Sequence, residues 1–291
     1  MRILKILMTG LLLIPIYSGR NRDVELNIGG TVTFPQISDA IQITRDNKEH
    51  FFASYFGINS FSKSEKYATV LETDLKYKLP DENDPATLGL VDLKTKDFIP
   101  LTTTRAWTFQ QGCMAHWLGT SPDSLIIYND FRKDKFVSVI MNVHTKREIK
   151  VIPYPVSAVS PDGKLALSIN FSRLRITDPD YGYAGGGQDS RKEIPFPKDD
   201  GLFLINLETG SAKILVSIDK VKEVVTPPLK GGIETFNHMI FSKKGSKIFF
   251  LSRSRDINDR SVTRCFTVNI DGTDLQPCFP PGWEGSHFDW L

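Results

Sequence analysis

A few histidines, tyrosines and arginines are the residues of this sequence that could do chemistry. Three histidines each open a short stretch rich in apolar residues, and two tyrosines lie in a polar segment at 172–200. These residues are His116, His238, His287, Tyr181 and Tyr183. Together they suit an elimination beside a carboxylate, in which a base removes the neighbouring proton and an acid protonates the leaving oxygen. An arginine or a metal ion would neutralise the carboxylate during this reaction.

The same residue types can also bind a sugar without any reaction, because a tyrosine ring can stack on a sugar ring and an arginine can bind a carboxylate through two parallel hydrogen bonds. For the reaction we expect His116 as the base and Tyr183 as the acid, with Tyr181 as the second choice. Tyr183 is preferred because it lies close to the glycine run at 185–187, and glycines let a substrate approach closely. The expected substrate-binding residues are Arg173, Arg175, Arg191 and Asn129.

A fourfold repeat must position these residues. In each copy a short apolar strand leads through a Ser-x-x-Gly-like turn into a second strand. After a variable gap, a third strand leads through an Asn/Asp-x-x-Thr-like turn into a fourth. The first turns are Ser62–Glu65, Ser121–Ser124, Ser160–Gly163 and Ser242–Gly245, and the second turns are Asp92–Thr95, Asn142–Thr145, Asn206–Thr209 and Asn269–Gly272. Proline, aspartate and glycine in such turns favour tight hairpins.

Four-stranded repeats without a convincing amphipathic helix predict an all-β fold, a β-propeller with one sheet per blade. A β-sandwich is the alternative, which the repeats disfavour. Residues 40–44 resemble a fourth strand, and residues 286–291 resemble the first strand of a further blade. We therefore expect four full blades with partial flanking ones. Because propellers close to hide their sheet edges, we also expect a chain truncated at its carboxyl end relative to a larger propeller.

Antiparallel alternation places the starts of the first strands and the loops after the second strands on one face of the disc. The residues at such positions are His116, His238, His287 and Asn129, and the segment 172–200 is such a loop. We expect them to surround one funnel. Arg173 and Arg175 alternate along a strand-like exit, so only one can face the funnel, and we favour Arg173. His50 and His144 are interpreted as solvated.

The run Ser160–Lys164 and the run Asn206–Gly210 resemble the repeat of the TolB-like propellers. Other stretches resemble propeller-fold polysaccharide lyases of the ulvan lyase-like group. These stretches are Gln111–Trp117, Tyr128–Asp130 and Pro179–Tyr183. The openings at Asn237–His238 and Ser286–His287 are similar to those of oligogalacturonate lyases. The resemblance extends over roughly residues 40 to 291.

The resemblance implies a polysaccharide lyase that cleaves a uronate-containing polymer by β-elimination in the funnel. In the ulvan lyase-like group, a histidine and a tyrosine serve as base and acid, and an arginine neutralises the uronate. In oligogalacturonate lyases, histidines bind a divalent metal, which implies His238 and His287 as ligands of Zn, Ca or Mn here. The alternative function is a non-catalytic TolB-like propeller that binds a glycan or a protein through the same funnel.

Composition and the amino terminus limit the other possibilities. With 36 Lys+Arg against 34 Asp+Glu, the net charge of +2 disfavours a nucleic-acid binder. Arg2 and Lys5 precede an apolar run at 6–16, and small residues follow, which is typical of a secretory signal over residues 1–19. The run is too short to span a bilayer. We expect an exported protein, periplasmic or extracellular, with one incomplete propeller domain at 20–291 and no transmembrane segment in the mature chain.

Two of the three cysteines are placed to pair. Cys265 and Cys278 lie at equal distances from the turn centred between Asp271 and Gly272, so they should face each other across the last two strands of the fourth blade. In an exported protein this predicts a cross-strand disulfide. Cys113 is interpreted as a core residue.

Overall fold

The computed structural model describes residues 39–46, 48–185, 189–224, 232–255, 258, 261–280 and 285–290. The chain divides into two units, Met1–Ile41 and Gln42–Leu291. All the helices and strands described below belong to the second unit. The signal peptide predicted at residues 1–19 lies outside the described residues.

Within the second unit, the described strands form four antiparallel sheets of four strands each. Blade one is β1 (His50–Phe52), β2 (Tyr67–Glu72), β3 (Ala86–Asp92) and β4 (Phe98–Thr104). Blade two is β5 (His116–Trp117), β6 (Leu125–Arg132), β7 (Lys135–Asn142) and β8 (Arg147–Ile152). Blade three is β9 (Ala158–Val159), β10 (Leu165–Ser168), β11 (Gly201–Asn206) and β12 (Ala212–Ser217). Blade four is β13 (Ile233–Phe241), β14 (Lys247–Arg255), β15 (Ser261–Asn269) and β16 (Gln276–Pro277).

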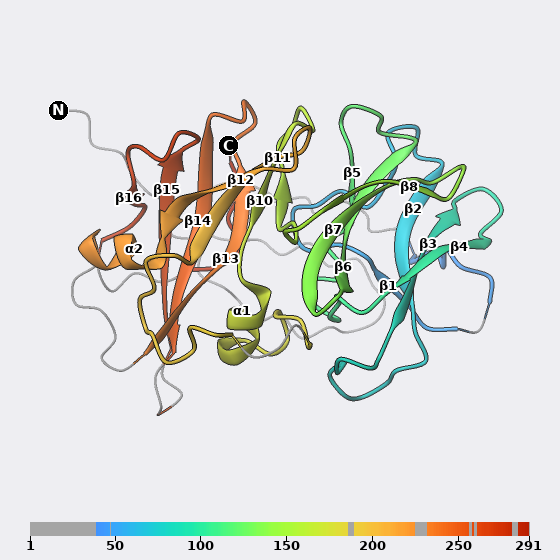
Figure 1. The fold of residues 1–291 in the computed structure, drawn as a ribbon. Coiled ribbons are helices and arrows are strands. Elements are labelled where there is room, and N and C mark those ends of the chain that lie inside the picture. Colours follow the sequence, from blue (N-terminus) through green and yellow to red (C-terminus); the bar gives the residue numbers. More distant parts are fainter. Residues whose placement is uncertain are drawn as a thin grey trace, which may run out of the picture. The chain divides into compact units, whose positions relative to one another are not determined.

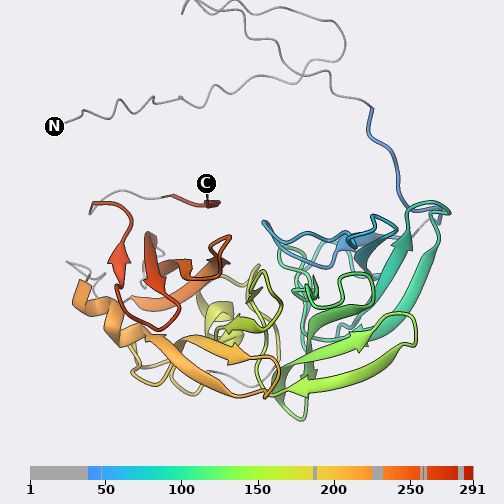
Figure 2. The same ribbon diagram turned by 90° about the horizontal axis from the view of Figure 1, so that it is seen from above.

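The blades follow one another in chain order, and each sheet keeps its strands in sequence order (Figures 1 and 2). This arrangement confirms the predicted all-β propeller with four full blades. Successive residues of a strand point to opposite faces of its sheet, so each inner sheet can pack on two neighbours. In β6, Ile126 joins a core cluster with Leu88 of blade one, whereas Ile127 joins a cluster with Leu167 of blade three. The central strands are therefore nearly continuous apolar runs.

The first turn of every blade forms as expected. In each, the backbone N–H of the fourth residue donates to the carbonyl of the leading serine, at 2.7–3.0 Å. In blade three the Ser160 hydroxyl also donates to Asp162 Oδ1 at 2.6 Å, and Gly163 adopts a left-handed φ of 69°. Glycine tolerates that conformation without a Cβ clash. These turn hydrogen bonds therefore hold each of the short first strands, β5 and β9, next to the strand that follows it.

The second turns also form, and their leading side chains cap them. The side chains of Asp92, Asn142 and Asn206 each accept a hydrogen bond from the backbone N–H three residues later, at 2.9–3.1 Å. In blade four the carbonyl of Asn269 accepts from Gly272 N–H at 2.9 Å instead. These local bonds explain why the third and fourth strands of each repeat are visible in the sequence.

Two short helices, α1 (Phe171–Thr177) and α2 (Ile218–Val224), depart from the prediction. The sequence indicated no helix and placed Arg173 and Arg175 on a strand-like segment. Asn170 starts α1 instead, because its side chain accepts a hydrogen bond from Arg173 N–H at 3.0 Å. Phe171 and Leu174 then bury one face of the turn. Neither described helix reaches the length and apolar character that a bilayer crossing requires.

The expected flanking strands do not form. Residues 40–44 and 286–290 have no strand conformation, and Leu291 lies outside the described residues. The carboxyl segment attaches through side chains rather than a backbone ladder. Trp290 Nε1 donates to the carbonyl of Ile240 at 3.2 Å, and the ring of Phe288 lies 5.3 Å from that of Phe249. A further blade's first strand was therefore the wrong prediction for this segment.

The cysteine pair has the expected register without the expected bond. Cys278 N–H donates to the carbonyl of Cys265 at 2.8 Å, which confirms that the two residues face each other. Their thiols are separate in the structure, as is that of the buried Cys113. The Cys265 thiol packs in a small apolar cluster with Phe249 and Leu251. The side chain of Cys278 packs against the same cluster, so both thiols serve as core contacts here.

Arg173 of α1 is held by a buried ion pair and by backbone carbonyls, one of which lies on β13 of blade four. The side chains of Arg173 and Asp189 are each 1% exposed, and Nη1 lies 3.0 Å from Asp189 Oδ2. The remaining guanidinium hydrogens donate to backbone carbonyls at 2.8–3.1 Å. These carbonyls belong to Arg191, Ile194, Pro195 and Glu234. Arg173 is therefore fully engaged in the fold.

We predict that Arg173→Met lowers the free energy of unfolding by about 3–5 kcal/mol, because Asp189 would be left as an unpaired buried carboxylate. The matched control is Arg191→Met, which removes a solvent-exposed pair with Asp199 at 2.8 Å and should cost less than about 1 kcal/mol. Urea unfolding of both variants measures the difference. Equal losses in the two variants would contradict the role assigned to Arg173.

Candidate functional site

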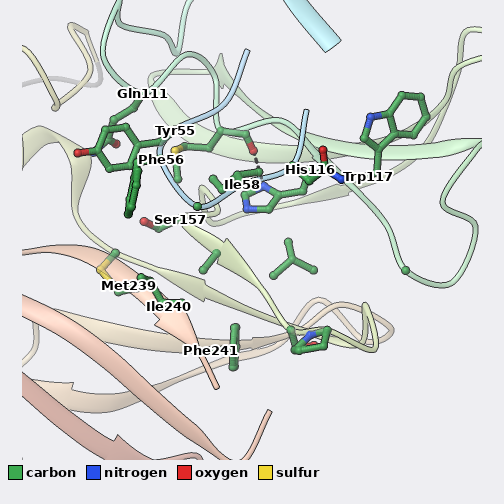
Figure 3. A pocket seen from close by; sticks show the side chains of 18 of the residues that line it. Tyr55, Phe56, Ile58, Gln111, His116, Trp117, Ser157, Met239, Ile240 and Phe241 are labelled. Carbon is green, nitrogen blue, oxygen red and sulfur yellow. Dashed lines mark hydrogen bonds between the residues drawn. The ribbon is translucent and has the colours of Figure 1, made fainter. Parts of the chain in front are cut away.

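A cavity of about 560 Å³ lies where the first strands of blades two, three and four meet the segment between β1 and β2 of blade one (Figure 3). Its lining residues fall within 55–63 of blade one, 111–122 of blade two, 157–161 of blade three and 237–241 of blade four. We call it the four-blade cavity. Because every blade contributes, its shape depends on the register of the whole propeller unit.

His116, the first residue of β5, faces this cavity. Its Nδ1 lies 2.7 Å from the carbonyl oxygen of Met114, which can only accept, so Nδ1 carries the ring hydrogen. Nε2 is buried and has no hydrogen-bond partner among the described residues. Burial lowers the pKa of His116 to about 4. The imidazole is therefore neutral at neutral pH, with its basic lone pair on Nε2.

The backbone is strained at the two histidine-bearing first strands. Met114 and His238 adopt left-handed φ values of 51° and 53°. For residues with a Cβ this conformation costs roughly 1–2 kcal/mol. In β13 the strain coincides with a register shift between Asn237 and Ile240. Strain of this kind collects at functional sites, where the surrounding fold imposes it.

A second group of aromatic and histidine side chains adjoins the cavity wall. The hydroxyl of Tyr55 hydrogen-bonds to Nε2 of His238 and lies 3.4 Å from Nε2 of His287. The Tyr181 ring meets that of Tyr55 edge to face at 5.8 Å. Desolvation and the nearby Tyr181 raise the pKa of Tyr55, so its hydroxyl keeps its proton. Desolvation and the positive charge of Arg253 lower the pKa of His238 to about 3.

An amide pair supplies further polar groups. Asn237 Oδ1 accepts from Gln111 Nε2 at 3.0 Å and from the backbone N–H of His238 at 2.8 Å, which fixes the amide orientation. Among the described residues, Gln111 Oε1 and Asn237 Nδ2 then have no partner, and neither do His116 Nε2 and His238 Nδ1. All four residues line the four-blade cavity. Because an unsatisfied buried polar group costs roughly 1–3 kcal/mol, this concentration points to a polar ligand.

The structure does not bring Tyr183 and His116 into one cavity as expected. The Tyr183 ring is fully buried and stacks on Phe171, with centroids 4.2 Å apart. Its hydroxyl accepts from Asn129 Nδ2 at 3.0 Å, and burial raises its pKa well above the usual value. Asn129 is further held by both backbone groups of Val156. Tyr183 lines a different pocket, of about 790 Å³, together with Arg175.

The three predicted arginines are engaged in contacts with loops, chiefly with the segment 172–200 between β10 and β11, which we call the insertion. Arg173 is buried in the ion pair described above, and Arg191 pairs with Asp199. Arg175 donates to the carbonyl of Pro179 at 2.8 Å and to that of Pro80 at 3.2 Å. Lys63 is the only lysine or arginine among the described residues that line the four-blade cavity.

The predicted metal ligands His238 and His287 do lie together. Their ring centroids are 5.4 Å apart, and both Nε2 atoms face the Tyr55 hydroxyl. Tyr181, the second choice for the acid, lies 5.9 Å from His238, ring to ring. Sequence reasoning missed Tyr55, Gln111 and Asn237 as site residues. For Tyr55 nothing local could reveal it, because its partners lie about 180 or more residues away in sequence.

No family model and no curated protein matches the sequence. Solved structures similar to it include a putative TolB from Agrobacterium tumefaciens, 11% identical, which covers 75% of this chain and 63% of that chain with a TM-score of 0.43. TolB from Acinetobacter baumannii is 11% identical over 79% of this chain and 54% of that chain, with a TM-score of 0.39. The periplasmic gluconolactonase of Pseudomonas aeruginosa is 12% identical over 77% and 70%, with a TM-score of 0.37. The chain thus spans less than two thirds of the two TolB structures, and likeness at this level carries nothing about activity.

We predict that His116→Gln flattens the pH dependence of stability. The pKa of His116 falls from 6.5 to about 4 on folding, so between these values the unfolded chain binds the proton more strongly. Stability therefore drops as pH falls through this window, by up to about 3 kcal/mol for one such group. The pKa of His238 is lowered too, so the profile should flatten rather than vanish. Urea unfolding from pH 7 downward measures this, and parallel profiles for the variant and the wild type would refute it.

Proposed function

We propose that the four-blade cavity binds a sugar residue of a uronate-containing polysaccharide and that the protein cleaves the chain there by β-elimination. The observation that carries the proposal is the buried His116, whose Nε2 is a neutral base without a partner among the described residues. A fixed tautomer with its lone pair in a cavity is the state that a general base needs. Fold likeness alone would not support an activity.

In the proposed reaction, His116 Nε2 removes the proton from the carbon next to the uronate carboxylate. The electron pair left behind forms a carbon–carbon double bond, and the bond from the ring to the neighbouring glycosidic oxygen breaks. Tyr55 replaces Tyr183 as the proposed acid and gives its proton to that oxygen. Burial raises the pKa of Tyr55, so the hydroxyl is protonated at neutral pH and its proton is present to be transferred. The products are a shortened chain and an unsaturated uronate.

The carboxylate needs positive charge or donors as negative charge develops on it. Asn237 Nδ2 offers a buried donor without a partner among the described residues, and Lys63 offers a cation at the cavity wall. Phe56 and Phe61, which are 48% and 39% exposed, line the cavity with apolar surface for a sugar ring. We therefore propose Asn237 and Lys63 as substrate-binding residues in place of the engaged arginines.

A divalent ion fits the same region. The two imidazoles of His238 and His287, whose ring centroids are 5.4 Å apart, would hold it, and nitrogen donors favour Zn²⁺ or Mn²⁺ over Ca²⁺. When bound, such an ion would neutralise the uronate carboxylate. Export to the periplasm or outside the cell is part of the proposal, because polysaccharides of this kind are met there.

A second candidate function is glycan or protein binding without catalysis. The observation that favours it is that Arg173, Arg175 and Arg191 are committed to loop contacts. A cavity with few cations stabilises an eliminating carboxylate less, yet it still satisfies the hydroxyl groups of a neutral sugar.

The test is the ultraviolet absorbance of the unsaturated uronate when the protein meets pectic or ulvan-type polymers. We expect an increase with the wild type and a loss of about 10²-fold or more in rate for His116→Ala and Tyr55→Phe, the usual scale for a general base or acid. His144→Ala is the matched control, since His144 lies in the exposed turn between β7 and β8. It should keep the wild-type rate.

Two outcomes would count against the proposal. An undiminished rate in His116→Ala would remove His116 as the base. If no uronate polymer gives an unsaturated product but a polymer binds with an affinity that Asn237→Ala weakens, the binding function replaces the lyase.

A further inference from the structure

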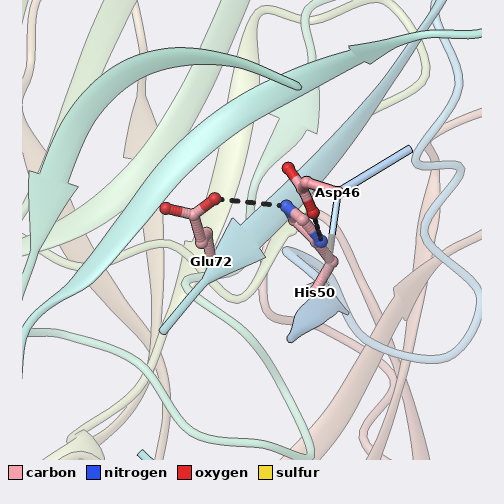
Figure 4. A group of neighbouring side chains, drawn as sticks. All are labelled: Asp46, His50 and Glu72. Atoms are coloured by element: carbon pink, nitrogen blue, oxygen red, sulfur yellow. Dashed lines mark ion pairs between the residues drawn. The ribbon is translucent and has the colours of Figure 1, made fainter. Parts of the chain in front are cut away.

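A separate cluster of three ligand-bearing side chains lies on blade one (Figure 4). His50 begins β1 and pairs across the sheet with Glu72, the last residue of β2. Asp46 lies four residues before His50. His50 Nδ1 is 3.5 Å from Asp46 Oδ1, and Nε2 is 3.3 Å from Glu72 Oε2. We call this group the His50 cluster.

The interpretation of His50 as solvated is wrong. Its side chain is 7% exposed and packs against the ring of Phe98 at 5.0 Å, whereas Glu72 is 14% and Asp46 40% exposed. Neither ring nitrogen has a hydrogen-bond partner among the described residues. A neutral imidazole carries one hydrogen, so its other nitrogen would point a lone pair at a carboxylate. The cluster therefore needs a cation, either a second proton or a metal ion.

Distances separate these two cations. A charge-assisted N–H···O bond spans about 2.7–2.9 Å, and both gaps in the cluster are longer, at 3.3 and 3.5 Å. Two ligand atoms that each lie about 2.1 Å from a zinc ion at a tetrahedral angle are about 3.4 Å apart. One ligand atom from each residue can be chosen so that all lie within 4.8 Å of one another. One ion can use only one ring nitrogen, and the 3.3 Å gap between His50 Nε2 and Glu72 Oε2 suits two ligands of such an ion, with Asp46 as the third ligand within 4.8 Å.

We propose that Asp46, His50 and Glu72 form a site for a divalent transition metal of the Zn²⁺ type. One imidazole nitrogen and two carboxylate oxygens are donors that zinc accepts. Lys48 Nζ holds Oε1 of Glu72 at 2.6 Å and leaves Oε2 directed at His50. The exposed Asp46 gives the ion a path from solvent. The ion would tie the segment before β1 to the end of β2, away from the His238–His287 pair.

The experiment is a calorimetric titration of the metal-stripped full-length protein with ZnCl2. We expect His50→Gln to lose one equivalent of bound zinc, or to bind it at least about 100-fold more weakly. The matched controls are His144→Gln, which changes a histidine on an exposed turn, and His238→Gln, which affects the other candidate ligands. Both should keep the equivalent that His50→Gln loses. Zinc should also raise the melting temperature of the wild type more than that of His50→Gln.

A second variant protects the test against misfolding. Glu72→Gln preserves shape and should weaken the same equivalent, with circular dichroism as the check on folding. If His50→Gln and Glu72→Gln bind as much zinc as the wild type with equal affinity, the site is overturned. It is equally overturned if the wild type binds no zinc.

Discussion

One buried guanidinium, that of Arg173, fixes how blades three and four meet. Its contacts reach the backbone of β13 at Glu234, the carboxylate of Asp189 and three carbonyls of the insertion. The same insertion carries Tyr181 to the edge of Tyr55 and His238. Breaking the ion pair would leave a buried charge, which is far more costly than never having placed it there. The position of the site's aromatic wall thus depends on an interaction well inside the fold.

The four-blade cavity differs from the surroundings of Arg173, because several of its groups lower the stability of the fold. Left-handed residues at Met114 and His238 and several unpartnered polar atoms are each unfavourable by themselves. The rest of the propeller holds them through strand pairing and turn hydrogen bonds. A site with this much uncompensated polarity is organised for a ligand rather than for folding. That contrast with the satisfied core around Arg173 is what marks the cavity as functional.

The blades could be predicted from the sequence because their signals are local. The leading serine and the Asn or Asp of each turn bond to backbone a few residues away, so the repeat is readable without a structure. The site could be predicted only in part. His116 was identified by its place at a strand start, but the burial of Tyr183 and Arg173 depends on partners such as Phe171 and Glu234 that meet only in the fold. The helix α1 was missed because its cap, Asn170, sits in a segment whose alternating arginines resemble a strand.

His116 and His238 occupy equivalent places in the repeat but have different surroundings. Both stand at the first strand of a blade, and burial lowers the pKa of each. They differ in the partner of Nε2, which is absent among the described residues for His116 and is the Tyr55 hydroxyl for His238. Tyr55 comes from blade one, so the difference arises between blades and not within the repeat. A repeated fold therefore supplies matching imidazoles to one cavity, and a single non-repeated tyrosine gives the two imidazoles different surroundings.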